Sequence, residues 1–133
     1  MKKLAVFALV LFILCEVSVA VAGHNISGIW REDSPANSDV ANAQLMYAQS
    51  GNNVQVVGYF EFKGTPCVWY GSGILRGNAL EYSVIYSKPY PDWRGNGADG
   101  KHVMTLSGDG KTVTGKWHNN NGDSGPARYI KQK

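Results

Sequence analysis

Short runs of alternating apolar and polar residues, separated by turn residues, fill the chain from about residue 27 to its end. Two sets of apolar residues each occupy one side of such a run: Val56, Gly58, Phe60 and Phe62, and Leu80, Tyr82, Val84 and Tyr86. A period of two places these side chains on one face of a β-strand. Because Ser, Thr, Glu and Lys lie opposite, the pattern predicts a sheet with one face on a core and the other in water.

Gly, Asn, Asp and Pro divide this region into about eight strands. The predicted strands are 27–31, 44–49, 54–63, 67–75, 79–87, 102–107, 112–118 and 127–131. Most connections are two to five residues long, which suits hairpins between sequential neighbours. The sequence therefore predicts an all-β, antiparallel up-and-down barrel, because closure leaves no exposed edge. A two-sheet β-sandwich is the alternative.

The first residues have the pattern of a secretory signal peptide. Lys2 and Lys3 precede an apolar run that ends at Cys15, and the small residues Ala20 and Ala22 suit cleavage after position 22. We expect residues 1–22 to be a signal peptide and residues 23–133 to be a single secreted or periplasmic domain. An uncleaved membrane anchor is the alternative, although the apolar run is short for a spanning helix.

Charge and chemistry-bearing residues exclude several function classes. The net charge is +3, and it becomes nearly even without the leader, which argues against nucleic-acid or membrane binding. Only Cys67 remains after the leader, so no internal disulfide is possible. No His, Cys or carboxylate has metal-ligand spacing, and no nucleophile, acid and base set is recognisable. We therefore expect no metal, no cofactor and no catalytic residues.

The segment Ser27-Gly28-Ile29-Trp30 opens the first predicted strand with Gly-x-Trp, and Gly115 and Trp117 repeat that pattern near the other end of the chain. This resembles the calycin group of meander barrels, which includes lipocalins and avidins. In lipocalins the tryptophan closes one barrel end beside an arginine, and the resemblance assigns that part to Arg128. The lipocalin disulfides and C-terminal helix are missing, and avidin's biotin-contacting residues cannot be placed.

The resemblance implies a non-enzymatic binding protein that holds a small apolar or amphipathic ligand inside the barrel. The aromatic residues expected in the interior are Tyr47, Phe60, Trp69, Tyr82 and Tyr86. Small barrels either fill with side chains or hold one small ligand, so a packed core is the alternative.

A second hypothesis is a secreted or periplasmic inhibitor that binds a partner enzyme through a long loop predicted at 87–101. Tyr90, Trp93 and Arg94 stand among prolines and glycines there and suit a contact surface. The alternative is that Trp93 folds back into the core.

Overall fold

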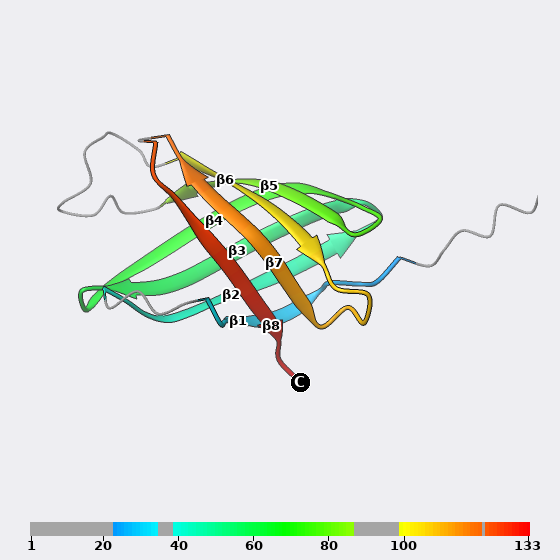
Figure 1. Cartoon of the computed structure of the whole chain (residues 1–133), viewed down its shortest axis with the longest axis horizontal. Coiled ribbons are helices and arrows are strands. Elements are labelled where there is room, and N and C mark those ends of the chain that lie inside the picture. Colours follow the sequence, from blue (N-terminus) through cyan, green and yellow to red (C-terminus); the bar gives the residue numbers. More distant parts are fainter. Residues whose placement is uncertain (1–22, 35–38, 87–98, 121) are drawn as a thin grey trace, which may run out of the picture.

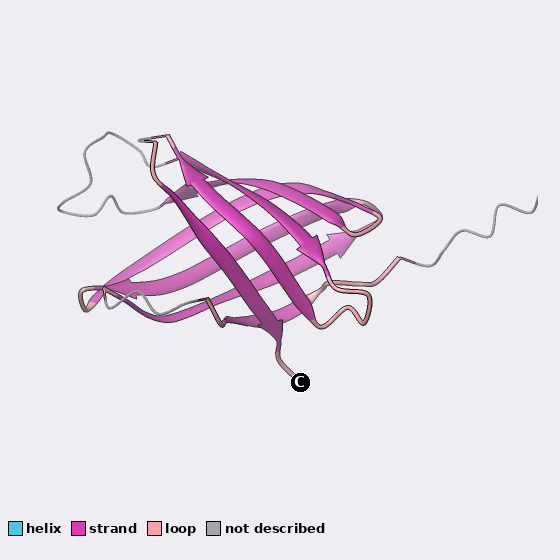
Figure 2. Ribbon diagram, in the orientation of Figure 1, coloured by secondary structure: helices cyan, strands magenta, loops and turns pink. Residues whose placement is uncertain are grey.

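The computed structural model describes residues 23–34, 39–86, 99–120 and 122–133, in which every regular element is a β-strand (Figure 2). The strands are β1 (Gly28–Glu32), β2 (Val40–Ser50), β3 (Asn53–Phe62), β4 (Thr65–Arg76), β5 (Ala79–Tyr86), β6 (Asp99–Leu106), β7 (Thr112–Asn119) and β8 (Ser124–Lys131). No helix in this part of the chain is long and apolar enough to cross a membrane.

Each strand pairs antiparallel with its sequence neighbour, and β1 pairs with β8 to close the sheet into a barrel (Figure 1). The predicted up-and-down barrel is confirmed, and the sandwich alternative is wrong. The predicted signal peptide lies outside the described residues.

Three strands begin at least three residues earlier than the sequence predicted. β2 starts at Val40 rather than at Gln44, because a β-bulge between Ala41 and Gln44 shifts the register and Asn42 takes a positive φ of 55°. β6 starts at Asp99 rather than at position 102, so residues 99–101 belong to a strand and not to the predicted loop. β8 starts at Ser124 rather than at position 127.

The inward faces of the strands form one aromatic and aliphatic core. Its largest fully buried side chains include Trp30, Tyr47 and Tyr82. Glycine makes room for close approach in the barrel wall: a Cβ at Gly58 would overlap the indole of Trp69, and a Cβ at Gly115 would overlap the backbone of β6. These positions let rings and strands approach closely inside a narrow barrel.

One end of the barrel carries the β2–β3, β4–β5 and β6–β7 turns, and the segment before β1 closes it. Ile26 and Trp30 are fully buried there, and the Trp30 indole N–H donates a hydrogen bond of 2.9 Å to the Ile26 carbonyl oxygen. The ammonium group of Lys131 lies 5.6 Å from the centre of the Trp30 ring and donates to the carbonyl oxygen of Asn25 at 2.9 Å. We call this the closed end.

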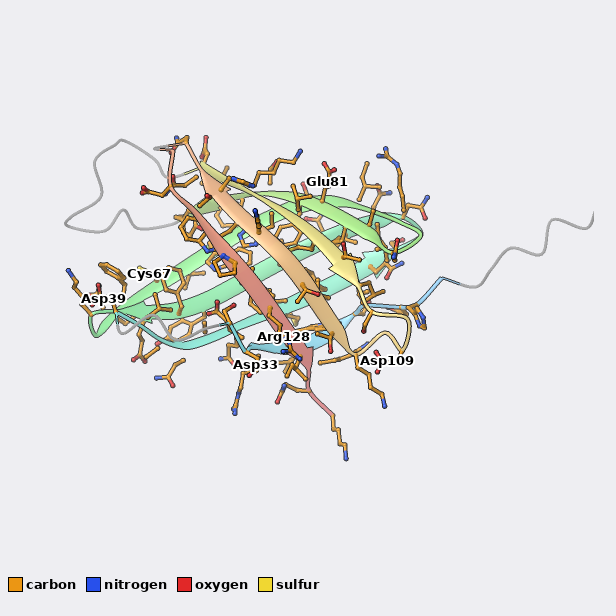
Figure 3. All side chains as sticks on the ribbon, viewed as in Figure 1. Asp33, Asp39, Cys67, Glu81, Asp109 and Arg128 are labelled. Atoms are coloured by element: carbon orange, nitrogen blue, oxygen red, sulfur yellow. The ribbon has the colours of Figure 1, made fainter. Side chains whose placement is uncertain are left out.

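The cation beside Trp30 is therefore Lys131, whereas the resemblance assigned that place to Arg128. Ala127 and Tyr129 point inward, so alternation turns Arg128 to the outer face, where its Nε lies 3.6 Å from an Asp33 carboxylate oxygen (Figure 3).

The opposite end, which we call the open end, is where β1, β3, β5 and β7 finish and β2, β4, β6 and β8 begin. Figure 3 shows Cys67 and Asp39 toward this end and Asp109 toward the closed end. Cys67 is a buried free thiol.

The outer face of β1–β5 carries a continuous apolar row. Five exposed side chains are direct cross-strand partners in sequence: Ile29, Met46, Val57, Tyr70 and Ile85. Each is roughly half exposed to solvent. On β1–β5 the predicted alternation of apolar inward and polar outward residues is therefore incomplete, because part of the outward face is also apolar.

Candidate functional site

A pocket of about 100 Å³ enters the barrel at the open end. Its wall comes from strands all round the barrel and consists of Glu32, Val40, Ala43, Gln44, Tyr59, Phe60, Trp69, Tyr86, His102, Trp117 and Tyr129. Most of this wall is aromatic, and the polar groups are few. Such a balance is typical of small-molecule sites.

Strand register brings these side chains together although they are far apart in sequence. His102 on β6 lies opposite Tyr82 on β5 and opposite Trp117 on β7. Glu32 on β1 lies opposite Tyr129 on β8. Cross-strand partners point to the same face of a sheet, so both sets project into the barrel.

The β2 bulge also shapes the pocket. Because it adds a residue to β2, both Val40 and Ala43 line the pocket. Bulges often re-aim side chains beside functional sites in this way.

Three buried polar side chains form a chain of hydrogen bonds behind the pocket. The Tyr47 hydroxyl donates to the Tyr82 hydroxyl at 3.0 Å, and the Tyr82 oxygen lies 3.0 Å from Nδ1 of His102. The His102 ring stacks on Tyr82 with centroids 4.7 Å apart and on Trp69 with centroids 5.3 Å apart. Packing on both rings and one hydrogen bond therefore fix the orientation of the imidazole.

The other ring nitrogen of His102 has no partner. Within the described residues, Nε2 of His102 is the one buried side-chain nitrogen or oxygen without a hydrogen bond. The residue is 3% exposed, and burial lowers its pKa from 6.5 to about 4, so the imidazole is neutral at physiological pH. A buried polar atom left unpaired is rare in folded proteins and calls for an explanation.

Burial also shifts the acidic groups of the wall. It raises the pKa of the half-buried Glu32 carboxyl, and the hydrogen bond with the Ser34 side chain offsets part of that shift. Burial likewise raises the pKa of Tyr86 to about 12 and that of Tyr129 well above 10. The Tyr86, Tyr129 and His102 side chains of the pocket wall are therefore uncharged at neutral pH.

The five aromatic residues predicted as ligand contacts all lie inside the barrel, but only three reach the pocket. Phe60, Trp69 and Tyr86 line it, whereas Tyr47 and Tyr82 are almost fully buried behind it. The packed-core alternative therefore describes the closed half of the interior, and the open half keeps a pocket.

Of the predicted motif residues, Trp30 sits at the closed end and Gly28 lies against the Lys131 side chain. The sequence suggested only a structural role for Trp117 in the repeated Gly-x-Trp motif, and the structure places it in the pocket wall. The predicted partner contacts Tyr90, Trp93 and Arg94 lie outside the described residues.

Sequence reasoning missed His102 and Glu32 as pocket residues. A signal for His102 was present, since it alternates with Met104 and Leu106 and shares their inward face. Glu32 had no such signal, because it ends a short strand that the sequence placed one residue earlier.

Other surface features offer less chemistry. A larger hollow of about 740 Å³ lies on the outer face of β3–β7 beside Tyr70 and Lys101, and it contains no buried unpaired polar atom. Among the described residues, no three His, Cys, Asp or Glu side chains gather closely enough to hold a metal ion.

Comparison with protein-family models and with curated proteins finds no match to this chain.

Proposed function

We propose that this chain is an exported, non-enzymatic binding protein that holds a small amphipathic molecule in the open-end pocket. The observation that carries the proposal is a buried polar atom with no partner, Nε2 of His102, on a residue that lines a largely aromatic cavity. A site that combines apolar walls with a few fixed polar groups suits a ligand of mixed character.

The volume of the pocket limits the ligand to about one ring. A dry cavity of about 150 Å³ holds a benzene molecule. The open-end pocket has about 100 Å³ and opens at the barrel mouth, so one six-membered ring enters with its substituent near the rim. A long acyl chain does not fit, because the closed half of the barrel is filled by Trp30, Tyr47 and Tyr82.

The closed eight-stranded meander is also the architecture of calycins, which supports placing the ligand within the barrel. The Gly28-x-Trp30 opening and its indole at the closed end are in keeping with that group. The calycin relationship is part of this proposal.

A pair of matched variants tests the function. Ala43 lines the pocket, so Ala43→Phe fills it, whereas Ala48→Phe adds the same ring to the exposed face of the same strand. Protein purified after expression of the full chain is titrated with one-ring compounds such as phenol, and tryptophan fluorescence is recorded. We expect saturable binding that Ala43→Phe abolishes and Ala48→Phe preserves. Absence of saturation, or equal binding by both variants, contradicts the proposal.

A second candidate is an inhibitor of a partner enzyme such as a lysozyme or a protease. The observation that favours it is the exposed apolar row on β1–β5, which ends at Ile85, and Trp93 follows Ile85 by eight residues in the sequence. Exposed apolar patches of this kind mark contact surfaces. We expect such an inhibitor to lower lysozyme or protease activity and the Trp93→Ala variant to lose that effect. Unchanged activity across both enzyme classes rejects this candidate.

A further inference from the structure

His102, whose Nε2 has no hydrogen-bond partner, lines a pocket whose wall also contains Glu32. We propose that the pocket selects a neutral or cationic one-ring molecule whose hydrogen-bond acceptor meets the Nε2–H of His102. This inference rests on the binding function proposed above, and it names the chemical class of the ligand.

We infer the tautomer of His102 from the hydrogen-bond chain, with Tyr47 as the first donor. Tyr82 accepts the hydroxyl hydrogen of Tyr47, which leaves its own hydrogen directed at Nδ1 of His102. A neutral imidazole carries one hydrogen, and an accepting Nδ1 places it on Nε2. The pocket therefore presents an N–H donor and needs an acceptor, such as a carbonyl oxygen, from its occupant.

Burial makes this donor selective. His102 is buried and stacked against both Trp69 and Tyr82, and its Nε2 has no hydrogen-bond partner. A buried donor left unpaired carries a desolvation penalty, which an apolar occupant leaves in place and an occupant with an acceptor removes. The site therefore discriminates between rings of equal size by their polar atom.

The walls favour a flat occupant. Phe60, Trp69, Tyr86 and Trp117 contribute aromatic faces and edges around the pocket. Aromatic rings pack on one another in stacked or edge-to-face arrangements, and their faces also attract cations. A planar ring that is neutral or carries a positive substituent suits these walls.

Glu32 disfavours an anion. It lines the same pocket, and burial already makes its carboxylate costly to ionise. A second negative charge in this small volume adds like-charge repulsion. Benzoate is therefore a poor ligand, although it has the shape and the acceptor oxygens of a good one.

Three probes of similar size test these statements on the purified full-chain product. Benzamide has a carbonyl acceptor and no charge, toluene has no acceptor, and benzoate is an anion. We expect benzamide to bind about tenfold more tightly than toluene or benzoate, which is the effect of about one hydrogen bond. Binding is measured by calorimetry and by chemical-shift titration.

Variants separate the contributions. His102→Phe keeps a ring stacked against Trp69 and Tyr82 but removes the N–H, so the affinity for benzamide should fall to that for toluene. His118→Phe makes the same change on the exposed face of β7, outside the pocket, and should leave benzamide binding unchanged. Glu32→Gln removes the negative charge and should raise benzoate affinity toward that of benzamide.

Imidazole ¹⁵N spectra of the unaltered protein decide the tautomer even if His102→Phe does not fold. We expect a protonated Nε2 whose resonance moves on addition of benzamide. Protonated Nδ1, equal affinity for benzamide and toluene, or tightest binding of benzoate overturns this inference and leaves the binding function standing. Failure of all three probes to bind overturns the binding function and the inference together.

Discussion

The two ends of the barrel are built from the same eight strands but are completed differently. At the closed end Ile26 and Trp30 are fully buried, and the indole N–H of Trp30 has its hydrogen bond. At the open end His102 is also buried, yet its Nε2 is unpaired, and the half-buried Glu32 lines the same pocket. The closed end follows the rules of stable packing, whereas the open end departs from them, as functional sites do.

The largest expected effect comes from opening the closed end. Trp30→Ala removes a fully buried indole and its hydrogen bond, which costs about 3–5 kcal/mol of unfolding free energy. Urea unfolding measures the loss. Tyr70→Ala is the control, because this ring is about half exposed on the outer face, and we expect a much smaller loss there. Similar losses for the two variants would remove the contrast between interior and surface.

The next effect is the acid sensitivity of the open end. The pKa of His102 is about 4 in the folded chain and 6.5 in the unfolded chain, so the unfolded state binds more protons between these values. The contribution of neutral His102 to the unfolding free energy is therefore fully present above about pH 6.5. It is lost as the pH drops to about 4, by roughly 3 kcal/mol. Burial raises the pKa of Glu32, so the folded chain takes up this proton more readily than the unfolded chain. This contribution to the unfolding free energy therefore increases as the pH falls, opposite to that of His102.

Comparison of variants isolates the histidine term. We expect His102→Phe to lose this part of the pH dependence and His118→Phe to retain most of it, because burial is the larger cause of the lowered His102 pKa and His118 the smaller one. Urea unfolding at a series of pH values measures both. Parallel pH profiles for the two variants would show that His102 is not the responsible group.

The smallest effect concerns the close approach of Gly58 on β3 to the indole of Trp69 on β4. Gly58→Ala places a methyl group where the Trp69 indole lies, and overpacking of this kind costs about 1–3 kcal/mol. Gly108→Ala is the control, because a Cβ there meets no neighbour. Near-ultraviolet circular dichroism reports the Trp69 environment. An unchanged spectrum with unchanged stability would mean that Gly58 does not hold this ring in place.

The fold could be predicted from the sequence because alternation is a local property. The run Leu80, Tyr82, Val84 and Tyr86 predicted an inward face, and the same run lines the barrel interior. Short turns predicted sequential pairing, and the barrel has that order. The bulge at Asn42 carried no comparable pattern, so the start of β2 was placed too late.

The pocket was only half predictable, because its polar part depends on register. Tyr82 and His102 meet through a hydrogen bond that spans 20 residues, and no local pattern reveals which residues face each other across strands. The inward aromatic residues were found because they required only alternation. For Arg128, alternation is the better guide. The resemblance placed Arg128 beside the closing tryptophan, whereas its inward neighbours Ala127 and Tyr129 turn it to the outer face.

Both ends of the described chain leave the barrel on the side away from the pocket. The segment before β1 closes that side, and after β8 the Gln132 amide donates to the Ile29 carbonyl oxygen at 2.8 Å. A fusion partner or a surface tether joined at the C-terminus therefore leaves the mouth unobstructed. Under the proposed binding function, the immobilised barrel would serve as a sensor, because Trp69 and Trp117 line the pocket.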